Sequence, residues 1–172
     1  MPSQTKQTPI SSTLWSLPTR PGFWLGSLVL LLLAILVQRA WISDDAFITF
    51  RTVDNFLNGY GLVWNVGERV QSYTHPLWMF LLSLVNRLSG ELVFSSLVLS
   101  IVLGLAVFGL VGWRLATSPT SAAFALLGLG LSNAFIDYST SGLENPLSHL
   151  LLVGFFVLVF TLKPAPRNAF WL

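Results

Sequence analysis

Asp44 and Asp45 form an adjacent pair of carboxylates whose type and position could do chemistry. They follow closely on the apolar run Pro21 to Gln38, so they emerge at a membrane surface if that run crosses a bilayer. Carboxylates close to lipid are costly, because removing a charge from water is strongly opposed. We therefore interpret the polar stretch from Ile42 to Pro76 as the candidate catalytic loop of a membrane enzyme.

A structural role explains the same pair equally well from the residues alone. Ser43 is a good helix N-cap, and acids in a first turn are favoured by the helix dipole by about 0.3–1 kcal/mol each. Apolar residues with a helical period follow, at Ala46, Phe50, Val53 and Leu57. This pattern predicts a surface helix that lies along the membrane with its apolar side down, with both acids in its first turn.

The composition indicates a membrane protein. Hydrophobic residues make up 53% of the chain, charged residues only 9%, and the mean hydropathy is +0.71. An ordinary soluble domain carries about 25% charged residues. The net charge of +2 is too small to indicate a nucleic-acid partner, and the absence of cysteine excludes disulfides and thiolate sites.

The predicted fold is an all-α integral membrane protein with about four transmembrane helices. Each predicted span is apolar and long enough to cross a hydrocarbon core of about 30 Å, and the spans are residues 21–41, 92–114, 115–136 and 146–162. The first is interpreted as a retained span rather than a signal peptide, because no small-residue cleavage site follows it. The apolar segment 76–88 is shorter, and we expect a juxtamembrane helix there.

The acidic residues predict the orientation. With four spans, all seven Asp and Glu residues fall in the two loops 42–91 and 137–145, which we place outside the cytoplasm. Five Lys and Arg residues lie on the other side against four on the acidic side, which favours a cytoplasmic N-terminus. Residues 1–20 are predicted to be a disordered cytoplasmic tail, and residues 163–172 a truncated cytoplasmic one.

Four ordered polar blocks resemble a known family. They are Asp44-Asp45-Ala46-Phe47-Ile48 with Arg51, Gly59-x-Gly61-Leu62-Val63-x-Asn65 with Gly67-Glu68, Tyr73-Thr74 with Pro76-Leu77-Trp78, and Gly142-Leu143-Glu144 with Pro146-Leu147. Over roughly residues 41 to 147 this pattern is similar to the N-terminal part of bacterial polyprenyl-phosphate-dependent glycosyltransferases of the GT-C fold. Within them it looks most like the terminal arabinofuranosyltransferase-like membrane proteins of cell-envelope assembly.

The resemblance implies a function and a set of site residues. The donor would be a sugar on a polyprenyl phosphate, and the acceptor a lipid or glycan at the outer face of a bacterial inner (plasma) membrane. Asp44 is implied as the general base of an inverting transfer, with Asp45 as the second candidate or as a ligand to the acceptor or a metal. Arg51 or a divalent cation would neutralise the leaving phosphate. The further candidate substrate contacts are Tyr73, His75 and Glu144.

Each of these assignments has an alternative. Glu144 could simply be an acid at a helix N-terminus, and His75 a residue that precedes a helix. The family usually has Glu where this chain has Gln71, which removes one possible ligand. Full members are also longer, so we expect a fragment. A non-catalytic membrane subunit that binds polyprenyl lipids would need no base, whereas a transporter is disfavoured because the acids lie outside the predicted spans.

Overall fold

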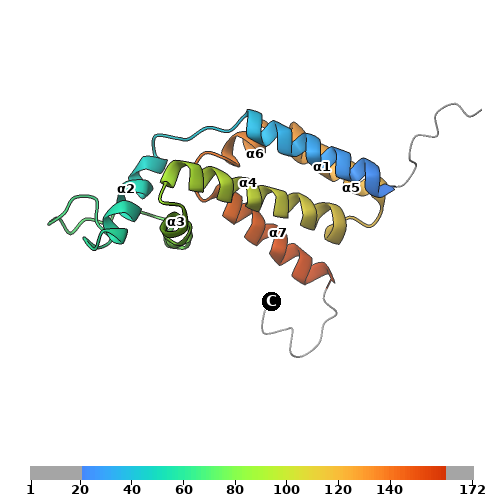
Figure 1. The fold of residues 1–172 in the computed structure, drawn as a ribbon. Helices are drawn as coiled ribbons and strands as arrows, with labels where there is room; N and C mark the ends of the chain where they lie inside the picture. Colours follow the sequence, from blue (N-terminus) through green and yellow to red (C-terminus); the bar gives the residue numbers. More distant parts are fainter. Residues whose placement is uncertain (1–20, 162–172) are drawn as a thin grey trace, which may run out of the picture.

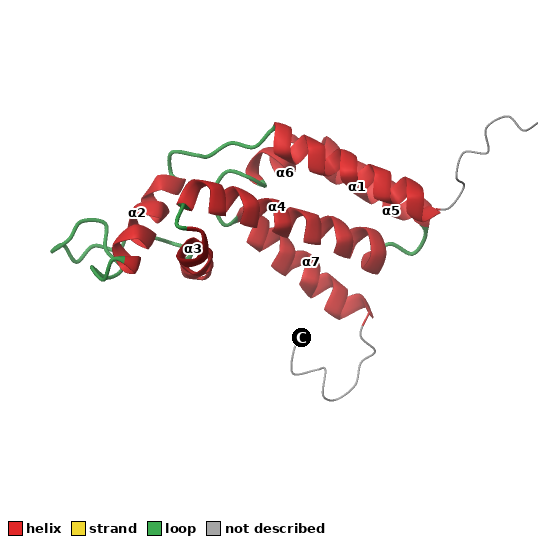
Figure 2. Cartoon of the chain, viewed as in Figure 1, coloured by secondary structure: helices red, strands yellow, loops and turns green. Residues whose placement is uncertain are grey.

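The computed structural model describes residues 21–161, and this part of the chain is helical with no β-strand. The prediction of an all-α chain is therefore confirmed for these residues (Figure 2). The predicted tails 1–20 and 163–172 lie outside the described residues. The elements are α1 (Pro21–Gln38), α2 (Ala46–Leu57), α3 (Pro76–Ser89), α4 (Leu92–Leu110), the π-helical turn η1 (Val111–Leu115), α5 (Pro119–Leu131), α6 (Asn133–Tyr138) and α7 (Asn145–Thr161).

The helices α1, α4, α5 and α7 form an elongated bundle, with α2 and α3 gathered at one end of it (Figure 1). The apolar core of the bundle is centred on Leu32, Leu36, Phe108 and Leu126. Small residues allow close packing, since a Cβ on Gly104 would lie 3.2 Å from a methyl group of Leu36. This end-on arrangement places the polar residues that follow α1 and precede α7 close to α2 and α3.

One helix among the described residues is both long and apolar enough to cross a membrane: Leu92–Leu115, which joins α4 to η1. The helices Gly22–Gln38, Pro119–Leu131 and Asn145–Phe160 are apolar but shorter. The four-span arrangement thus stays a prediction.

The helix expected over residues 115–136 is interrupted. The Ser118 side chain and the Ser121 side chain cap each other's backbone N–H groups, and Pro119 at the first helical position fixes the start of α5. At the other end α5 stops at Leu131, and the Ser132 hydroxyl accepts a hydrogen bond from the Phe135 N–H to begin α6. Local capping by serine, which hydropathy does not detect, breaks the segment into two helices.

The amphipathic helix predicted after Ser43 is present as α2, but it begins later than expected. Asp44 and Asp45 lie in the turn before it rather than in its first turn, and Asp45 is the N-cap residue. The apolar face that we expected to rest on the membrane packs instead on α3 and on the first turn of α7. The cluster comprises Ala46, Phe50, Val53, Trp78, Met79, Leu82 and Leu147.

The connection from α1 to α2 is fixed to α6 and to the loop that follows it. The Trp41 indole N–H donates to the Asp137 carbonyl at 2.8 Å, and the Arg39 guanidinium lies 3.5 Å from the Asp137 carboxylate. Further along, the Ser43 N–H donates to the Ser141 carbonyl at 2.9 Å. These contacts bring residues about one hundred positions apart to the same end of the bundle.

Candidate active-site cavity

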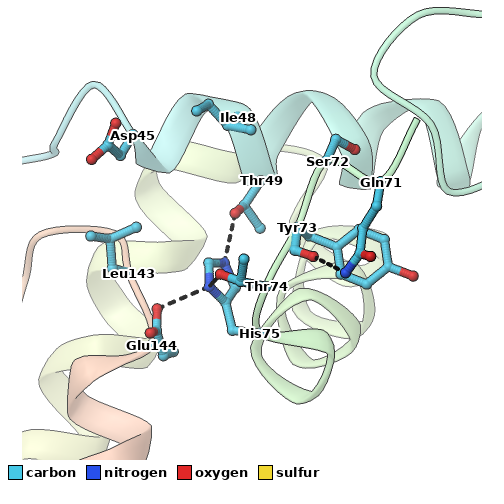
Figure 3. A pocket seen from close by; sticks show the side chains of 10 residues that line it. All are labelled: Asp45, Ile48, Thr49, Gln71, Ser72, Tyr73, Thr74, His75, Leu143 and Glu144. Carbon is cyan, nitrogen blue, oxygen red and sulfur yellow. Dashed lines mark hydrogen bonds and ion pairs between the residues drawn. The ribbon is translucent and has the colours of Figure 1, made fainter.

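A cavity of about 620 Å³ lies between α2, the segment before α3 and the segment before α7 (Figure 3). Polar side chains dominate its lining, and only two aliphatic residues take part. The lining residues are Asp45, Ile48, Thr49, Gln71, Ser72, Tyr73, Thr74, His75, Leu143 and Glu144. Four of the predicted site residues are therefore brought together: Asp45, Tyr73, His75 and Glu144.

The two neighbouring aspartates have different surroundings. The Asp44 carboxylate accepts hydrogen bonds from the Asp45 N–H at 3.1 Å and from the Ser43 hydroxyl at 3.3 Å, and it does not line the cavity. Asp45 is an exposed residue that lines the cavity, and its side chain makes no helix-capping bond. Within the described part of the chain this side chain has no hydrogen-bond or ion-pair partner. Local turn formation thus accounts for Asp44, whereas the Asp45 carboxylate is exposed beside the cavity and has capacity left for a ligand.

Three helices point their N-termini at this cavity. Asp45 is the N-cap of α2, His75 is the N-cap of α3, and the carbonyl of Glu144 accepts the first backbone hydrogen bond of α7 from the Ser148 N–H. The N-terminus of a helix carries roughly half a positive charge. The arrangement therefore places the positive ends of three helices beside the residues Asp45 and Glu144.

His75 connects the walls of the cavity. Its Nδ1 lies 3.1 Å from Oε2 of Glu144, and its Nε2 lies 2.7 Å from the hydroxyl oxygen of Thr49. The Thr74 hydroxyl is 3.3 Å from the same Nδ1. One imidazole therefore joins α2, the start of α3 and the start of α7.

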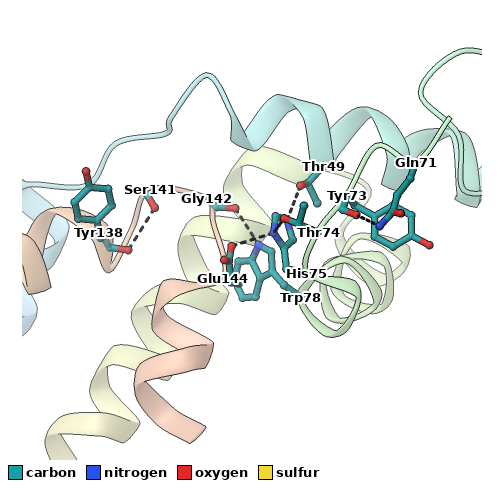
Figure 4. A network of polar contacts seen from close by, with 10 residues as sticks. All are labelled: Thr49, Gln71, Tyr73, Thr74, His75, Trp78, Tyr138, Ser141, Gly142 and Glu144. Carbon is teal, nitrogen blue, oxygen red and sulfur yellow. Dashed lines mark hydrogen bonds and ion pairs between the residues drawn. The ribbon is translucent and has the colours of Figure 1, made fainter. Parts of the chain in front are cut away.

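A glycine and a tryptophan hold the segment before α7 in place (Figure 4). The buried Trp78 indole N–H donates to the Gly142 carbonyl at 2.9 Å. Gly142 has a φ of 83°, and a Cβ at this position would lie 2.7 Å from the Cβ of Ala46. Only glycine accommodates both the left-handed backbone and the close approach of α2. This contact sets the position of Glu144 relative to Asp45.

Arg51, predicted to bind the donor phosphate, does not line the cavity. Its Nε donates to the Trp64 carbonyl at 2.9 Å and its Nη2 to the Asn65 side-chain oxygen at 2.8 Å. The guanidinium also lies 4.5 Å from the centre of the Trp64 ring. Arg51 holds the loop that follows α2 against that helix.

Two residues that the sequence analysis did not select take part in the site. Thr49 lines the cavity, and its helical spacing from Ala46 and Val53 could have placed it on the buried face. Arg69 lines an adjoining cavity of about 430 Å³ that shares Gln71 and Tyr73 with the first. No local pattern singles out Arg69, because the loop that carries it has no regular structure.

A resident metal is not supported by the arrangement of ligands. Within residues 21–161 no group of three or more His, Asp or Glu side chains is placed to hold a metal ion. The possible ligands Asp44 and Asp45 face different surroundings.

The fold and the cavity define a class: an all-helical protein with a membrane-length helix and a carboxylate-lined cavity at one end of its bundle. Over 122 residues, 64% of the chain, it is 35% identical to a terminal beta-(1->2)-arabinofuranosyltransferase of Mycobacterium tuberculosis. Over 119 residues it is 37% identical to the Corynebacterium glutamicum protein of the same name. The resemblance to terminal arabinofuranosyltransferase-like proteins is confirmed.

The similarity concerns a small part of these relatives. The matched region covers 19% of the Mycobacterium protein and 17% of the Corynebacterium protein. The chain therefore spans less than a fifth of the curated relatives that it matches. No protein-family model matches the chain, and no solved structure matches it.

Proposed function

We propose that this chain forms the acceptor-activating part of a membrane glycosyltransferase. The enzyme would pass an arabinofuranosyl or similar sugar from a polyprenyl-phosphate donor to a hydroxyl group of a cell-envelope lipid or glycan. The observation that carries this proposal is the Asp45 carboxylate, which lines the polar cavity without any partner in the described chain. The relatives named as arabinofuranosyltransferases supply the sugar class.

Asp45 acts as the general base in this proposal. Its carboxylate removes the proton of the acceptor hydroxyl while the acceptor oxygen forms its bond to the anomeric carbon. The bond from that carbon to the donor oxygen breaks, and the polyprenyl phosphate leaves with the electron pair. Attack opposite the leaving group inverts the anomeric carbon. The order of preference from the sequence is thereby reversed, because Asp44 faces its own turn.

Arg69 replaces Arg51 as the proposed partner of the leaving phosphate. Arg69 lines the adjoining cavity and has no ion-pair partner among residues 21–161. Arg51 has two of its donors bound to the loop. A guanidinium can bind phosphate through two parallel hydrogen bonds, so a free arginine beside the sugar site suits the leaving group.

We further propose that the cavity faces outward from a bacterial inner membrane that the chain crosses four times. The end of α1 and the starts of α4 and α7 lie at the same end of the bundle as α2 and α3 (Figure 1). This common end supports a single membrane face for Asp45, His75 and Glu144.

The test is sugar transfer in membranes that contain the full chain and an arabinosyl polyprenyl-phosphate donor. We expect Asp45→Asn to lower the rate by about 10²- to 10⁴-fold, the range for loss of a general base. Asp54→Asn is the matched control, because Asp54 is an exposed carboxylate of α2 that does not line this cavity. Undiminished transfer by Asp45→Asn would exclude Asp45 as the base.

The second candidate function is a non-catalytic membrane subunit that binds polyprenyl lipids. Such a subunit needs no general base, and this would fit the exposure of Asp45 to solvent. Wild-type membranes would then retain a polyprenyl-phosphate sugar without transferring it, and Asp45→Asn would leave this retention unchanged.

A further inference from the structure

Glu144, His75 and Thr49 form a continuous chain of contacts at the inner wall of the cavity (Figure 4). The His75 Nδ1 lies 3.1 Å from the Glu144 Oε2, and the His75 Nε2 lies 2.7 Å from the Thr49 Oγ1. Thr49 is 1% exposed and the His75 side chain 14%, while the Glu144 side chain is 38% exposed. The chain therefore runs from a partly hydrated carboxylate to a buried hydroxyl.

The chemistry of the groups fixes where the protons lie. A carboxylate only accepts hydrogen bonds, so the His75 nitrogen that faces Glu144 must carry the proton. The other nitrogen of a neutral imidazole is then an acceptor, and the Thr49 hydroxyl must donate to it. The Thr74 hydroxyl near Nδ1 is consistent with this order as a second acceptor for the same proton.

We propose that this proton order leaves Thr49, together with Asp45 and Glu144, able only to accept hydrogen bonds from the hydroxyl groups of a polyol. The donor groups of the cavity are carried by other lining residues, which are Gln71, Ser72, Tyr73 and Thr74. Thr49 has used its proton on His75, so the small part of its oxygen that reaches the cavity offers only lone pairs to a ligand. The two cavity carboxylates, Asp45 and Glu144, likewise only accept. Glu144 is a positioning residue in this arrangement, since it sets the tautomer through which Thr49 is oriented.

Thr49, Asp45 and Glu144 disfavour the binding of an anion. A phosphate oxygen would meet lone pairs and negative charge at Thr49, Asp45 and Glu144, and no donor among these three. The positive ends of the three helices do not change this, because two of the residues at those ends are the carboxylates themselves. The identification of the polyol as a sugar rests on the proposed function. The sugar would then bind in the cavity lined by Asp45 and Glu144, and the phosphate in the adjoining cavity lined by Arg69.

The first test measures the tautomer of His75 directly. The chain has two histidines, so ¹⁵N-histidine labelling of the full chain in detergent gives two imidazole signal sets, which His149→Gln or His75→Gln assigns. The measurement is made at about pH 8, above the range in which histidine ordinarily titrates. We expect His75 to carry its proton on Nδ1. A proton on Nε2, or on both nitrogens, would overturn the proposal.

Two variants and one control separate the positioning role of Glu144 from a general loss of structure. Glu144→Ala should remove the preference for the Nδ1 proton. Glu68→Ala is the control, because this glutamate bonds only to Asn65 in a loop away from the cavity and should leave the tautomer unchanged. Thr49→Val should keep the Nδ1 proton and shift only the Nε2 signal. A tautomer that is the same in Glu144→Ala and wild type would overturn the role of Glu144.

The second test uses methyl arabinofuranoside and inorganic phosphate as probes. We expect the sugar to shift the His75 signals of the wild type, with a smaller shift in Thr49→Val, and phosphate to leave them unchanged. An equal response to phosphate, or no response to the sugar, would overturn the acceptor-only role of Thr49, Asp45 and Glu144. A sugar response without transfer activity would refute the proposed function alone. If sugar transfer depends on Asp45 but His75 carries its proton on Nε2, this inference alone is refuted.

Discussion

At the scale of single residues, the surroundings of a charged side chain decide its role more than its type does. Asp44 and Asp45 are adjacent in sequence, yet one carboxylate closes a turn and the other lines a cavity. Arg51 and Arg69 differ in the same way, because the first is bound to its own loop and the second is free. The free member of each pair is the one with capacity left for a ligand.

The two arginines provide a matched pair for substitution. Arg69→Gln should lower kcat/KM for the polyprenyl-phosphate donor by about ten- to a hundredfold, because a hydrogen bond to a charged group contributes about 1.5–3 kcal/mol. Arg51→Gln should lower the free energy of unfolding instead, since its contacts to Trp64 and Asn65 hold a loop. Steady-state kinetics and denaturant unfolding in detergent measure the two effects. If Arg51→Gln lowers kcat/KM and Arg69→Gln lowers only the free energy of unfolding, Arg51 is the residue that binds the phosphate.

The sequence predicted the residue types of this site better than their partners. Asp45, Tyr73, His75 and Glu144 carry polar groups next to helix starts, and such signals are local. Thr49 was missed because it is a polar residue on the apolar face of α2, and the hydrophobic pattern alone does not indicate that such a residue lines a cavity. Whether an arginine is free or bound depends on contacts that only the folded loop makes.

At the scale of elements, the site depends on how closely α2 approaches the segment before α7. Gly142→Ala should lower the free energy of unfolding in two ways: the positive φ costs about 1–2 kcal/mol, and the overlap with Ala46 about 1–3 kcal/mol more. Gly59→Ala is the control, because Gly59 has the same φ of 83° with open space around it. Equal losses for the two variants in chemical denaturation would show that no close packing exists at Gly142.

The elements themselves were predicted unevenly, and the reason is physical. Period and length were sufficient for α2, α3 and α4, whose apolar stripes or runs are continuous. The break between α5 and α6 depends on the side chain of Ser132, which caps α6. Mean hydropathy over a window of many residues does not detect a single capping residue. The burial of α2 against α3 was missed because an amphipathic stripe does not say whether lipid or protein covers it.

At the scale of the whole molecule, the arrangement of the helices makes a prediction about the membrane. The chain has no native cysteine, so single cysteines can be labelled with an impermeant reagent. Asp54→Cys, Leu88→Cys and Tyr138→Cys replace exposed residues at the cavity end, and each should react from outside the cell. Thr117→Cys, in the turn before α5, should react only after the membrane is permeabilised.

Leu88 decides the status of α3 in this experiment. It is 84% exposed at the end of α3, a helix of 14 residues that is short for a bilayer of about 30 Å. If α3 lies at the interface, Leu88→Cys and Asp54→Cys react from the same side. If the two cysteines react from opposite sides, α3 crosses the membrane, and α4 then crosses it in the direction opposite to the one predicted. Tyr138→Cys would then no longer share a face with Asp54→Cys, and Asp45 and Glu144 could not line one cavity at one membrane surface.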